Sequence, residues 1–401
     1  MVQDSLFFCI KGENSDGNVF ANEALEKGAK YVITDNKQML GTHRAAIVVD
    51  DVLKTLQQLA CYHRQQLTIP IIGITGTNGK TTTKELVARV LAKKYNTAST
   101  SENFNNHIGV PLTLLSIKKE DEVAVVEMGA NHRGEIAELC RIAQPQYGLI
   151  TNIGKAHLEG FGTMESIVET KTALYTTAKV LFVNIEDGLL RQQAEEKVNQ
   201  TEKKELYFYG KNSDTTGTIL QMNPYLVLNL FGNKIQTQFT GNYNLPNILA
   251  AAAIGCYFGV PKQDICNAIS EYTPQNKRSQ IINTKYNTII ADYYNANPSS
   301  MKAALLNFLE IDAPNKLAIL GDMMELGENS IQEHKTIIDF CEQHLLKTFF
   351  IGAEFYKNKN NRSHFFINVD DCNDNLKKIQ TKNRFILIKG SRGIHLENIA
   401  L

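Results

Sequence analysis

A short apolar strand that runs into a glycine-rich loop and then into a helix places the strongest constraint on the fold of this chain. Residues 71–91 read IIGITGTNGKTTTKELVARVL. Glycines let backbone N–H groups turn toward an anion, and the helix N-terminus adds the positive end of its dipole. The strict phosphate-loop spacing requires glycine at position 74, where this chain has Ile74. We interpret the segment as a variant phosphate-binding loop between a strand and a helix.

Two more short apolar runs follow the loop, EVAVVEMG at 122–129 and YGLITNIG at 147–154. Helical stretches separate these runs, which is the pattern of a parallel sheet with crossover helices. The strands of such sheets place functional groups at their carboxyl ends, where ligands bind. The sequence therefore predicts an α/β fold with a site where these strands end.

The chain has 401 residues, which is long for one hydrophobic core, so we expect several domains. Residues 1–69 are predicted to form a small α/β domain with strands at 5–10, 29–34 and 45–51 and a helix that begins at Asn18 and ends at Gly28. The central domain is predicted over 70–273. Residues 274–401 are predicted to form a second, smaller nucleotide-fold-like domain. Its strands are expected in NTIIAD, KLAILGD, TFFIG and RFILIKG.

The segment YLVLNLFGNKIQTQF at 225–239 differs from its surroundings. Leu226, Leu228 and Leu230 alternate with other residues, and Ile235, Thr237 and Phe239 alternate on the way back. We predict an antiparallel hairpin appended to the central domain, with a two-residue turn at Gly232 and Asn233. The apolar run ILAAAAIGCYFGV at 248–260 is too short to span a bilayer and predicts a buried helix.

Composition excludes some classes of function. The 42 basic and 42 acidic side chains cancel, which argues against a general attraction to nucleic acid or to an anionic membrane. The seven cysteines lie far apart with no CxxC pair. Their odd number and spacing predict reduced, mostly buried thiols and a cytoplasmic location.

Five polar side chains near the predicted strand ends are candidates for the chemistry. Lys80 can reach the outer phosphates of a nucleotide, and Thr81 can offer its hydroxyl to Mg²⁺. Glu127 ends a predicted strand beside the loop, where a carboxylate suits Mg²⁺. His157 and Lys171 follow the next strand, and neither is decisive alone.

In combination, the motifs of this chain resemble those of the Mur ligases. The ordered set begins with TGTNGKTT and continues with ENFNNHIGVPLTLL, VVEMGANHRGEI, NIGKAHLEGFG, GNYNLPNILAAAAI, DYYNANPSSM, LGDMMELGENS and KGSRG. The resemblance runs from about Leu6 to the C-terminus. It implies a domain for a uridine nucleotide, a central parallel-sheet ATPase domain, and a C-terminal Rossmann-like domain that closes over ATP.

The resemblance also implies the reaction. Within the family, the motifs are most similar to those of ligases that join D-alanyl-D-alanine to UDP-N-acetylmuramoyl-tripeptide. ATP would phosphorylate the tripeptide carboxylate, and the dipeptide amine would displace phosphate. ATP and Mg²⁺ are the implied cofactors, and the two peptide substrates are the implied partners of a monomeric enzyme.

Site residues follow from the matching motif positions. The nucleotide side comprises Thr75, Gly76, Thr77, Asn78, Gly79, Lys80, Thr81, Thr82, Asn244, Asn247, Arg278 and Asp292, with the two asparagines at 244 and 247 at the adenine. The substrate side comprises Asn105, Asn106, His107, Tyr294, Asn295, Asn297, Lys389, Ser391 and Arg392. Thr81 and Glu127 would hold one Mg²⁺, and Glu127, His157 and a carbamylated Lys171 would surround a second. The catalytic set is Lys80, Glu127, His157 and Lys171.

Three departures from the family pattern affect these expectations. The chain begins almost at the strand that follows the usual uridine-binding segment, so the first domain is expected to be incomplete. Asn18 stands where a histidine is common, and Ala173 stands where an acidic residue often follows the carbamylated lysine.

Alternatives remain open at this point. A sister ligase that adds lysine or diaminopimelate would share the ATPase motifs, but the Asp-Asn-Pro-Arg string of the diaminopimelate type does not occur here. Folylpolyglutamate synthetases usually show a Ser-Pro-His segment where this chain has TSENFNNHIG. A Mur-like protein that binds without catalysis is a third class. The sequence does not decide between lysine and diaminopimelate in the tripeptide.

Overall fold

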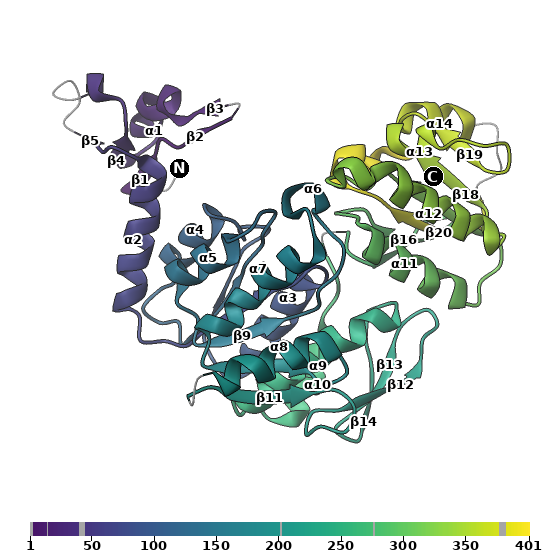
Figure 1. Cartoon of the computed structure of the whole chain (residues 1–401), viewed down its shortest axis with the longest axis horizontal. Helices are drawn as coiled ribbons and strands as arrows, with labels where there is room; N and C mark the ends of the chain where they lie inside the picture. The colour runs from purple at the N-terminus through teal and green to yellow at the C-terminus, as the bar shows by residue number, and fades with distance from the viewer. Residues whose placement is uncertain (1–2, 14, 40–44, 201–202, 276, 377–381) are drawn as a thin grey trace.

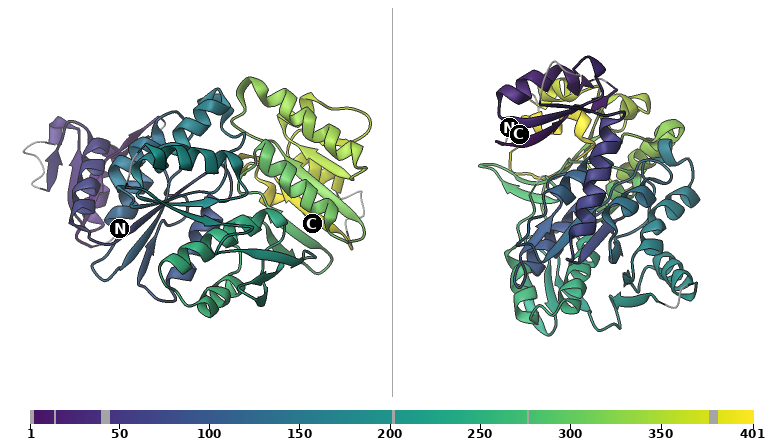
Figure 2. Two further views of the ribbon diagram at one scale, coloured as in Figure 1. Left: turned by 60° about the horizontal axis from the view of Figure 1, so that its bottom comes forward. Right: turned by 90° about the vertical axis from the view of Figure 1, so that its left-hand side faces the viewer.

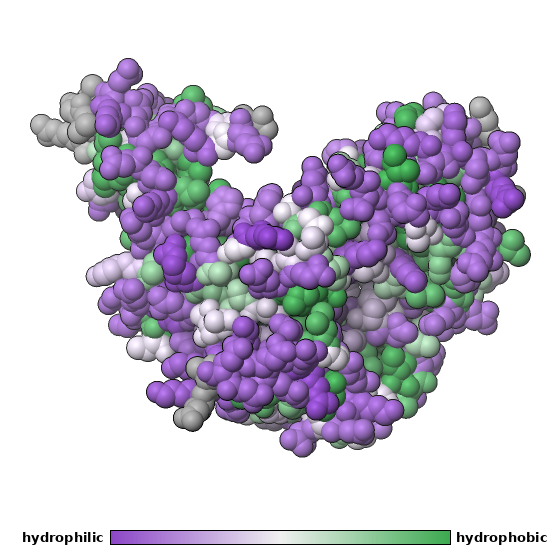
Figure 3. Space-filling view, viewed as in Figure 1, coloured by the Kyte–Doolittle hydropathy of each residue, from purple (hydrophilic) through white to green (hydrophobic). Residues whose placement is uncertain are grey.

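The computed structural model describes residues 3–13, 15–39, 45–200, 203–275, 277–376 and 382–401. These form three α/β parts in the order of the chain, with the central part between the other two (Figure 1). The left view of Figure 2 also shows the central part between the other two. The molecule is hollowed between the first and the C-terminal parts, above the central part, and the visible face is largely hydrophilic (Figure 3).

The first part is built on a three-stranded parallel sheet in the order β1-β4-β5. Its elements are β1 (Ser5–Phe8), β2 (Lys11–Gly12), β3 (Ser15–Asp16), η1 (Gly17–Phe20), α1 (Ala21–Glu26), β4 (Ala29–Thr34), η2 (Lys37–Met39) and β5 (Ala46–Val48). All three predicted strands are present, and the predicted helix begins as a 3-10 turn. Its apolar core is small, with Cys9, Ala21, Ala24, Ala29 and Val32 buried.

Helix α2 (Val52–Gln66) connects the first part to the central one. Asp51 caps it by accepting a hydrogen bond from the backbone N–H of Lys54. At its far end, the buried Arg64 donates to the backbone carbonyls of Ala143 and Gln144, at the end of α5. The helix therefore packs on the central part, although its residues fall within the predicted first domain. The bounds of the three predicted domains themselves stay a prediction.

The central part contains a six-stranded, fully parallel sheet in the order β11-β10-β9-β6-β8-β7. Its strands are β6 (Ile71–Thr75), β7 (Thr97–Ser99), β8 (Val123–Glu127), β9 (Tyr147–Ile150), β10 (Val180–Asn184) and β11 (Glu205–Tyr209). Every residue of β6 and β8 is buried, because helices cover both faces of the sheet. This confirms the prediction made from the apolar runs.

Two groups of helices cover that sheet. Apolar side chains of α4, α5, α7 and α8 form one core, and those of α3, α9 and α10 form the other. The helices are α3 (Lys80–Leu91), α4 (Gly109–Leu115), α5 (Glu135–Ala143), α6 (Leu158–Phe161), α7 (Met164–Thr177), α8 (Gly188–Asn199), α9 (Leu245–Tyr257), preceded by η3 (Asn242–Asn244), and α10 (Lys262–Glu271). Residues Asn247–Gly255 of α9 are all buried, as predicted for the alanine-rich run.

The predicted hairpin is present and is part of a three-stranded antiparallel sheet of β12 (Gly217–Gln221), β13 (Val227–Leu230) and β14 (Asn233–Gln236). The six alternating side chains are all buried. The predicted turn was wrong by one residue, since Asn233 pairs with Leu230 and the turn lies at Phe231 and Gly232. Both turn residues have positive φ, +54° and +82°, which the hairpin turn requires.

The C-terminal part contains a six-stranded sheet in the order β15-β16-β20-β17-β18-β19, with only β15 antiparallel. Its strands are β15 (Gln280–Asn283), β16 (Thr288–Asp292), β17 (Lys316–Gly321), β18 (Thr348–Ile351), β19 (His364–Phe366) and β20 (Phe385–Lys389). Its helices are α11 (Pro298–Glu310), η4 (Gly327–Asn329), α12 (Ser330–Gln343), α13 (Ala353–Lys357), α14 (Val369–Leu376), η5 (Arg392–Ile394) and η6 (Leu396–Asn398). The four predicted strands are all present.

Two further expectations can be compared with the structure. All seven cysteines are free and five of them are buried, as predicted. Within the described residues, none of the helices combines the length and apolar character needed to cross a bilayer.

Candidate active site

The loop after β6 has backbone angles that only glycine adopts easily. Gly76 has φ of +146°, and Gly79, which precedes α3, has φ of +78°. A Cβ on Gly76 would lie 1.9 Å from Oγ1 of Thr151, and one on Gly79 would lie 2.6 Å from Oδ1 of Asn247. Side chains at these positions would therefore clash as well as strain the backbone. The loop directs the N-terminus of α3 toward the cavity described below.

Residues at the end of β9 hold this loop in place. The backbone N–H of Asn78 donates to Oδ1 of Asn152, and its carbonyl accepts from Nδ2 of Asn152 and from Oγ1 of Thr151. Thr77 exchanges hydrogen bonds with the backbone of Gly154. Because both backbone groups of Asn78 are used, the loop is preorganised by its neighbour strand.

Two lysines share one acceptor behind the loop. Nζ of Lys80 donates to the carbonyl oxygens of Gly76 and Thr77, at 2.8 and 3.1 Å. Nζ of Lys171, which is 2% exposed, donates to the same carbonyl of Gly76 at 3.1 Å. Burial and the nearby charge of Lys80 lower the pKa of Lys171 to about 7. Burial also lowers the pKa of Lys80. The loop therefore carries a concentration of positive charge that an anion would relieve.

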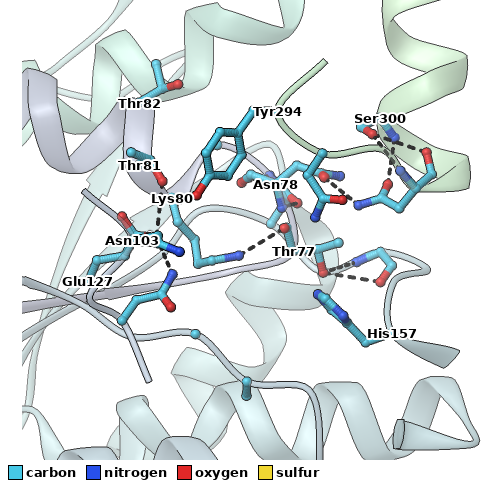
Figure 4. Close-up of a pocket in the computed structure, with 18 of the residues that line it drawn as sticks. Thr77, Asn78, Lys80, Thr81, Thr82, Asn103, Glu127, His157, Tyr294 and Ser300 are labelled. Atoms are coloured by element: carbon cyan, nitrogen blue, oxygen red, sulfur yellow. Dashed lines mark hydrogen bonds between the residues drawn. The ribbon is translucent and has the colours of Figure 1, made fainter. Parts of the chain in front are cut away.

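Glu127 lies opposite Lys80 at the end of β8 and is 1% exposed. Its Oε1 accepts from Oγ1 of Thr81 at 3.1 Å (Figure 4). The same oxygen accepts from Nδ2 of Asn105 at 2.8 Å. Its Oε2 is buried with no hydrogen-bond partner. A buried carboxylate oxygen without a partner is costly unless a cation or donor satisfies it.

These residues fit a magnesium site. A carboxylate oxygen, a threonine hydroxyl and nearby phosphates are the oxygen ligands that Mg²⁺ prefers. Among the described residues, no group of three or more His, Cys, Asp or Glu gathers as metal ligands. The predicted set contains only two residues of those types, Glu127 and His157, so phosphate and water would complete any shell.

His157 is directed toward the C-terminal part of the chain. Its Nδ1 lies 2.5 Å from Oε2 of Glu325, which precedes η4. The neighbouring backbone adds a contact, because the N–H of Glu159 donates to the carbonyl of Glu325. The close contact with His157 holds the pKa of Glu325 below its usual value. His157 therefore joins the two parts at one side of the loop.

Asn244 and Asn247 lie on the α3 side of the cavity, where α9 begins. Both are buried, and Nδ2 of Asn247 donates to Oδ1 of Asn244. Asn247 also accepts a hydrogen bond from Oγ1 of Thr83 on α3. The pair is thus connected to the helix that follows the loop.

The C-terminal part contributes charged and aromatic groups. Nζ of Lys389 donates to Oδ2 of Asp292 at 2.7 Å in a mostly buried ion pair. The guanidinium of Arg278 lies 3.9 Å from the ring centre of Tyr294, and its Nε is buried without a partner. The guanidinium of Arg392 lies 5.9 Å from the same ring.

A second link between the parts runs through the tip of the loop. Nδ2 of Asn297, the residue that caps α11, donates to Oδ1 of Asn78 at 2.8 Å. Nδ2 of Asn78 donates to Oγ of Ser299 at 3.0 Å. The start of α11 therefore contacts the phosphate loop directly.

These groups surround one cavity of about 790 Å³ between the central and C-terminal parts. The predicted site residues that line it are Thr77, Asn78, Gly79, Lys80, Thr81, Thr82, Asn105, Asn106, His107, Glu127, His157, Asn244, Asn247, Arg278, Asp292, Tyr294, Asn295, Asn297 and Lys389. Thr75, Gly76, Lys171, Ser391 and Arg392 are not among its lining residues. Lys171 lies behind Gly76, and the buried Ser391 accepts a hydrogen bond from the N–H of Met324.

Sequence reasoning missed three residues that shape this site. Asn152 binds the backbone of Asn78, and its place among the polar residues that end the predicted run YGLITNIG was a usable signal. Ser299 lies in the motif DYYNANPSSM, two residues after the predicted Asn297. Glu325 lies in the motif LGDMMELGENS, but the motif does not predict its contact with His157, because that contact depends on the packing of two distant segments.

Comparisons with known proteins cover almost the whole chain. Three family models match: the Mur ligase middle domain at 74–255, the Mur ligase, glutamate ligase domain at 277–392, and the Mur ligase family, catalytic domain at 1–64. The chain is 35% identical to the UDP-N-acetylmuramoyl-tripeptide–D-alanyl-D-alanine ligase of Bacillus subtilis, over 99% of this chain and 90% of that protein. It is 30% identical to the ligase of the same name from Rickettsia prowazekii, over 98% of this chain and 91% of that protein.

Solved structures agree with these matches. A crystal structure of MurF from Acinetobacter baumannii superposes with a TM-score of 0.88 at 29% identity, covering 98% of this chain and 89% of that one. MurF ligase from Thermotoga maritima in complex with ADP gives a TM-score of 0.83 at 27% identity, covering 99% and 93%.

Proposed function

Because the chain belongs to the Mur ligase family, we propose that it joins D-alanyl-D-alanine to UDP-N-acetylmuramoyl-tripeptide, using ATP, in peptidoglycan synthesis. The full-length similarity to ligases of that name supports the assignment. The structural observation that carries it is the unpaired Oε2 of Glu127, buried opposite Lys80 and a phosphate loop.

The proposed chemistry activates a carboxylate. A carboxylate is a poor acyl donor because its leaving group would be oxide. Transfer of the terminal phosphoryl group of ATP to the tripeptide carboxylate gives an acyl phosphate and ADP. The amine of D-alanyl-D-alanine then attacks the acyl carbon, loses a proton, and forms the amide as phosphate leaves.

The loop residues suit the first of these steps. The main barrier is charge repulsion between two anions. The N-terminus of α3 and the ammonium of Lys80 would place positive charge at the phosphates. Thr81 and Glu127 would hold Mg²⁺, which when bound neutralises phosphate charge. Lys80 would have to exchange its contacts with Gly76 and Thr77 for phosphate oxygens.

We also propose that CO₂ carbamylates Lys171. The reaction needs the neutral amine, which attacks the carbon of CO₂ and releases a proton to leave an anionic carbamate. A pKa of about 7 makes a large share of this lysine neutral at neutral pH. A carbamate would also remove the repulsion between Lys171 and Lys80. It would place an anionic oxygen donor where a bare ammonium would repel a dication.

The remaining assignments follow the cavity walls. We propose that Asn244 and Asn247 contact the adenine and that Arg278 and Asp292 contact ATP. We propose that the tripeptide lies along Asn106 and His107, and the dipeptide near Tyr294, Asn295 and Lys389. Asn297, Ser391 and Arg392 stay predicted substrate residues, although the first caps α11 and the other two lie off the cavity wall. A cytoplasmic, monomeric enzyme stays a prediction.

The test is a reconstituted ligation. Purified protein is incubated with Mg²⁺, ATP, the nucleotide tripeptide and D-alanyl-D-alanine, and the pentapeptide product is identified by mass spectrometry. ADP should form only when both peptide substrates are present. Turnover with free lysine, diaminopimelate or glutamate in place of the dipeptide would instead support a sister ligase. Nucleotide binding without turnover with any acceptor would indicate a non-catalytic relative.

A further inference from the structure

The carboxylate of Glu127 is held in one orientation by its neighbours. Its Oε1 receives hydrogen bonds from Thr81 and from Asn105, whereas Oε2 receives none. We infer that Asn105 is a positioning residue that presents Oε2 of Glu127 to Mg²⁺, rather than a contact for the peptide substrate. This inference rests on the proposed function.

The support for Asn105 is rigid. Its carbonyl accepts from the N–H of Gly129 at 2.7 Å, two residues beyond Glu127. A Cβ on Gly129 would lie 2.9 Å from Cγ and Oδ1 of Asn105, so the glycine allows this close approach. The amide of Asn105 is therefore fixed against the backbone that follows β8.

A second set of contacts ties the same segment to α3. The N–H of Glu127 donates to Oγ1 of Thr100 at 2.9 Å, and Nζ of the buried Lys84 donates to the carbonyl of Thr100 at 2.9 Å. Thr100, at the start of the segment that ends with Asn105, is thereby bound to α3 through Lys84 and to β8 through Glu127. This makes Asn105 a fixed donor rather than a mobile one.

The direction of the two hydrogen bonds has a chemical consequence. Thr81 donates its hydroxyl proton to Oε1, which leaves the hydroxyl lone pairs available to a cation. The amide of Asn105 also donates to Oε1, so both donors bind the same oxygen and Oε2 is left without a partner. Groups that orient a metal ligand in this way typically change metal affinity about 10- to 100-fold when they are removed.

The experiment measures magnesium dependence directly. The wild type and Asn105→Ala are titrated with a fluorescent ADP analogue at a series of Mg²⁺ concentrations, with no peptide substrate present. We expect Asn105→Ala to raise the Mg²⁺ concentration for half-maximal binding by about 10- to 100-fold. The KM for the nucleotide tripeptide, measured at saturating Mg²⁺, should change less than about threefold.

Matched variants separate positioning from other effects. Glu102→Gln alters an exposed residue of the same segment and should leave the Mg²⁺ requirement unchanged. In a Glu127→Ala background, replacing Asn105 should have no further effect, because the carboxylate that it orients is absent. If Asn105→Ala does not fold, Asn105→Leu fills the same volume without a donor and replaces it in the titration.

The outcomes distinguish this inference from the proposed function. If Mg²⁺ does not affect nucleotide binding by the wild type, the proposed function fails, and this inference with it. If nucleotide binding by the wild type depends on Mg²⁺, and Asn105→Ala reaches half-maximal binding at the same Mg²⁺ concentration, only this inference is overturned. A raised tripeptide KM with an unchanged Mg²⁺ requirement would show that Asn105 contacts the substrate instead.

Discussion

At the scale of single residues, Lys80 is the side chain whose charge the proposed reaction needs most. Replacing it with methionine should lower kcat for ligation by at least about a hundredfold, since a preorganised charge at the phosphates is lost. The melting temperature should change little, because the ammonium is partly buried and contacts only two loop carbonyls. Lys93→Met, which removes a surface partner of Glu271, is the control and should keep full activity.

Lys171 gives a pH-dependent prediction. Its pKa is about 7 in the folded chain and near 10.5 when unfolded, so the unfolded state binds more protons between these values. The free energy of unfolding should therefore gain up to about 1.4 kcal/mol per pH unit as pH rises through this window. Lys171→Met should remove that gain and be relatively more stable near pH 7. Denaturant titrations of both proteins at pH 7 and pH 9, in CO₂-free buffer, measure the difference. If the free energy of unfolding rose equally between pH 7 and pH 9 in the wild type and in Lys171→Met, the lowered pKa of Lys171 would be contradicted.

At the scale of elements, the turn between β13 and β14 depends on positive φ at two positions. Gly232→Ala should lower the free energy of unfolding by about 1 kcal/mol, because a Cβ there is strained although nothing lies within 4 Å of it. Phe231→Asn should lower the free energy of unfolding by less than a typical large-to-small substitution, since asparagine tolerates the positive φ of this position. Urea unfolding of the three proteins compares them. A Gly232→Ala variant as stable as the wild type would argue against the turn as described.

The start of α11 combines a helix cap with a contact to the phosphate loop. Asn297→Ala should lose about 1 kcal/mol of stability with the cap, and also the hydrogen bond to Asn78. Asn297→Asp keeps a capping oxygen but replaces the amide donor to Asn78. We expect both variants to raise the KM for ATP, and only the alanine variant to lower the melting temperature. If Asn297→Ala and Asn297→Asp lowered the melting temperature equally, loss of the helix cap could not account for the lower stability of the alanine variant.

At the scale of the whole molecule, polar contacts between the central and C-terminal parts act beside an apolar cluster that contains residues of both. The polar contacts include His157 with Glu325, Lys155 with Glu333, and the two bonds of Asn78. Glu325→Gln should weaken the first link and broaden the distribution of domain arrangements. Small-angle scattering should then give a larger radius of gyration, whereas Glu328→Gln in the same segment should not. An unchanged radius of gyration for Glu325→Gln would show that the other contacts hold the C-terminal part in place without this link.

Much of the fold followed from local patterns. The loop from Gly76 to Thr82, the buried strands β6 and β8, and the alanine-rich α9 were all predictable, because periodicity and glycine chemistry act over a few residues. The hairpin was predicted with its turn one residue too late, since Gly232 can occupy either turn position and only the pairing of Leu230 with Asn233 decides which.

The sequence by itself determined which residue types would meet at the carboxyl edge of the central sheet, and the family pattern supplied their expected roles. Only the tertiary structure decided that Lys171 lies behind Gly76, that Glu325 contacts His157, and that Oε2 of Glu127 has no partner. These features depend on distances between segments up to 168 residues apart and on the exclusion of water from the groups involved. Burial and long-range contact are properties of the packed chain, and no local pattern encodes them.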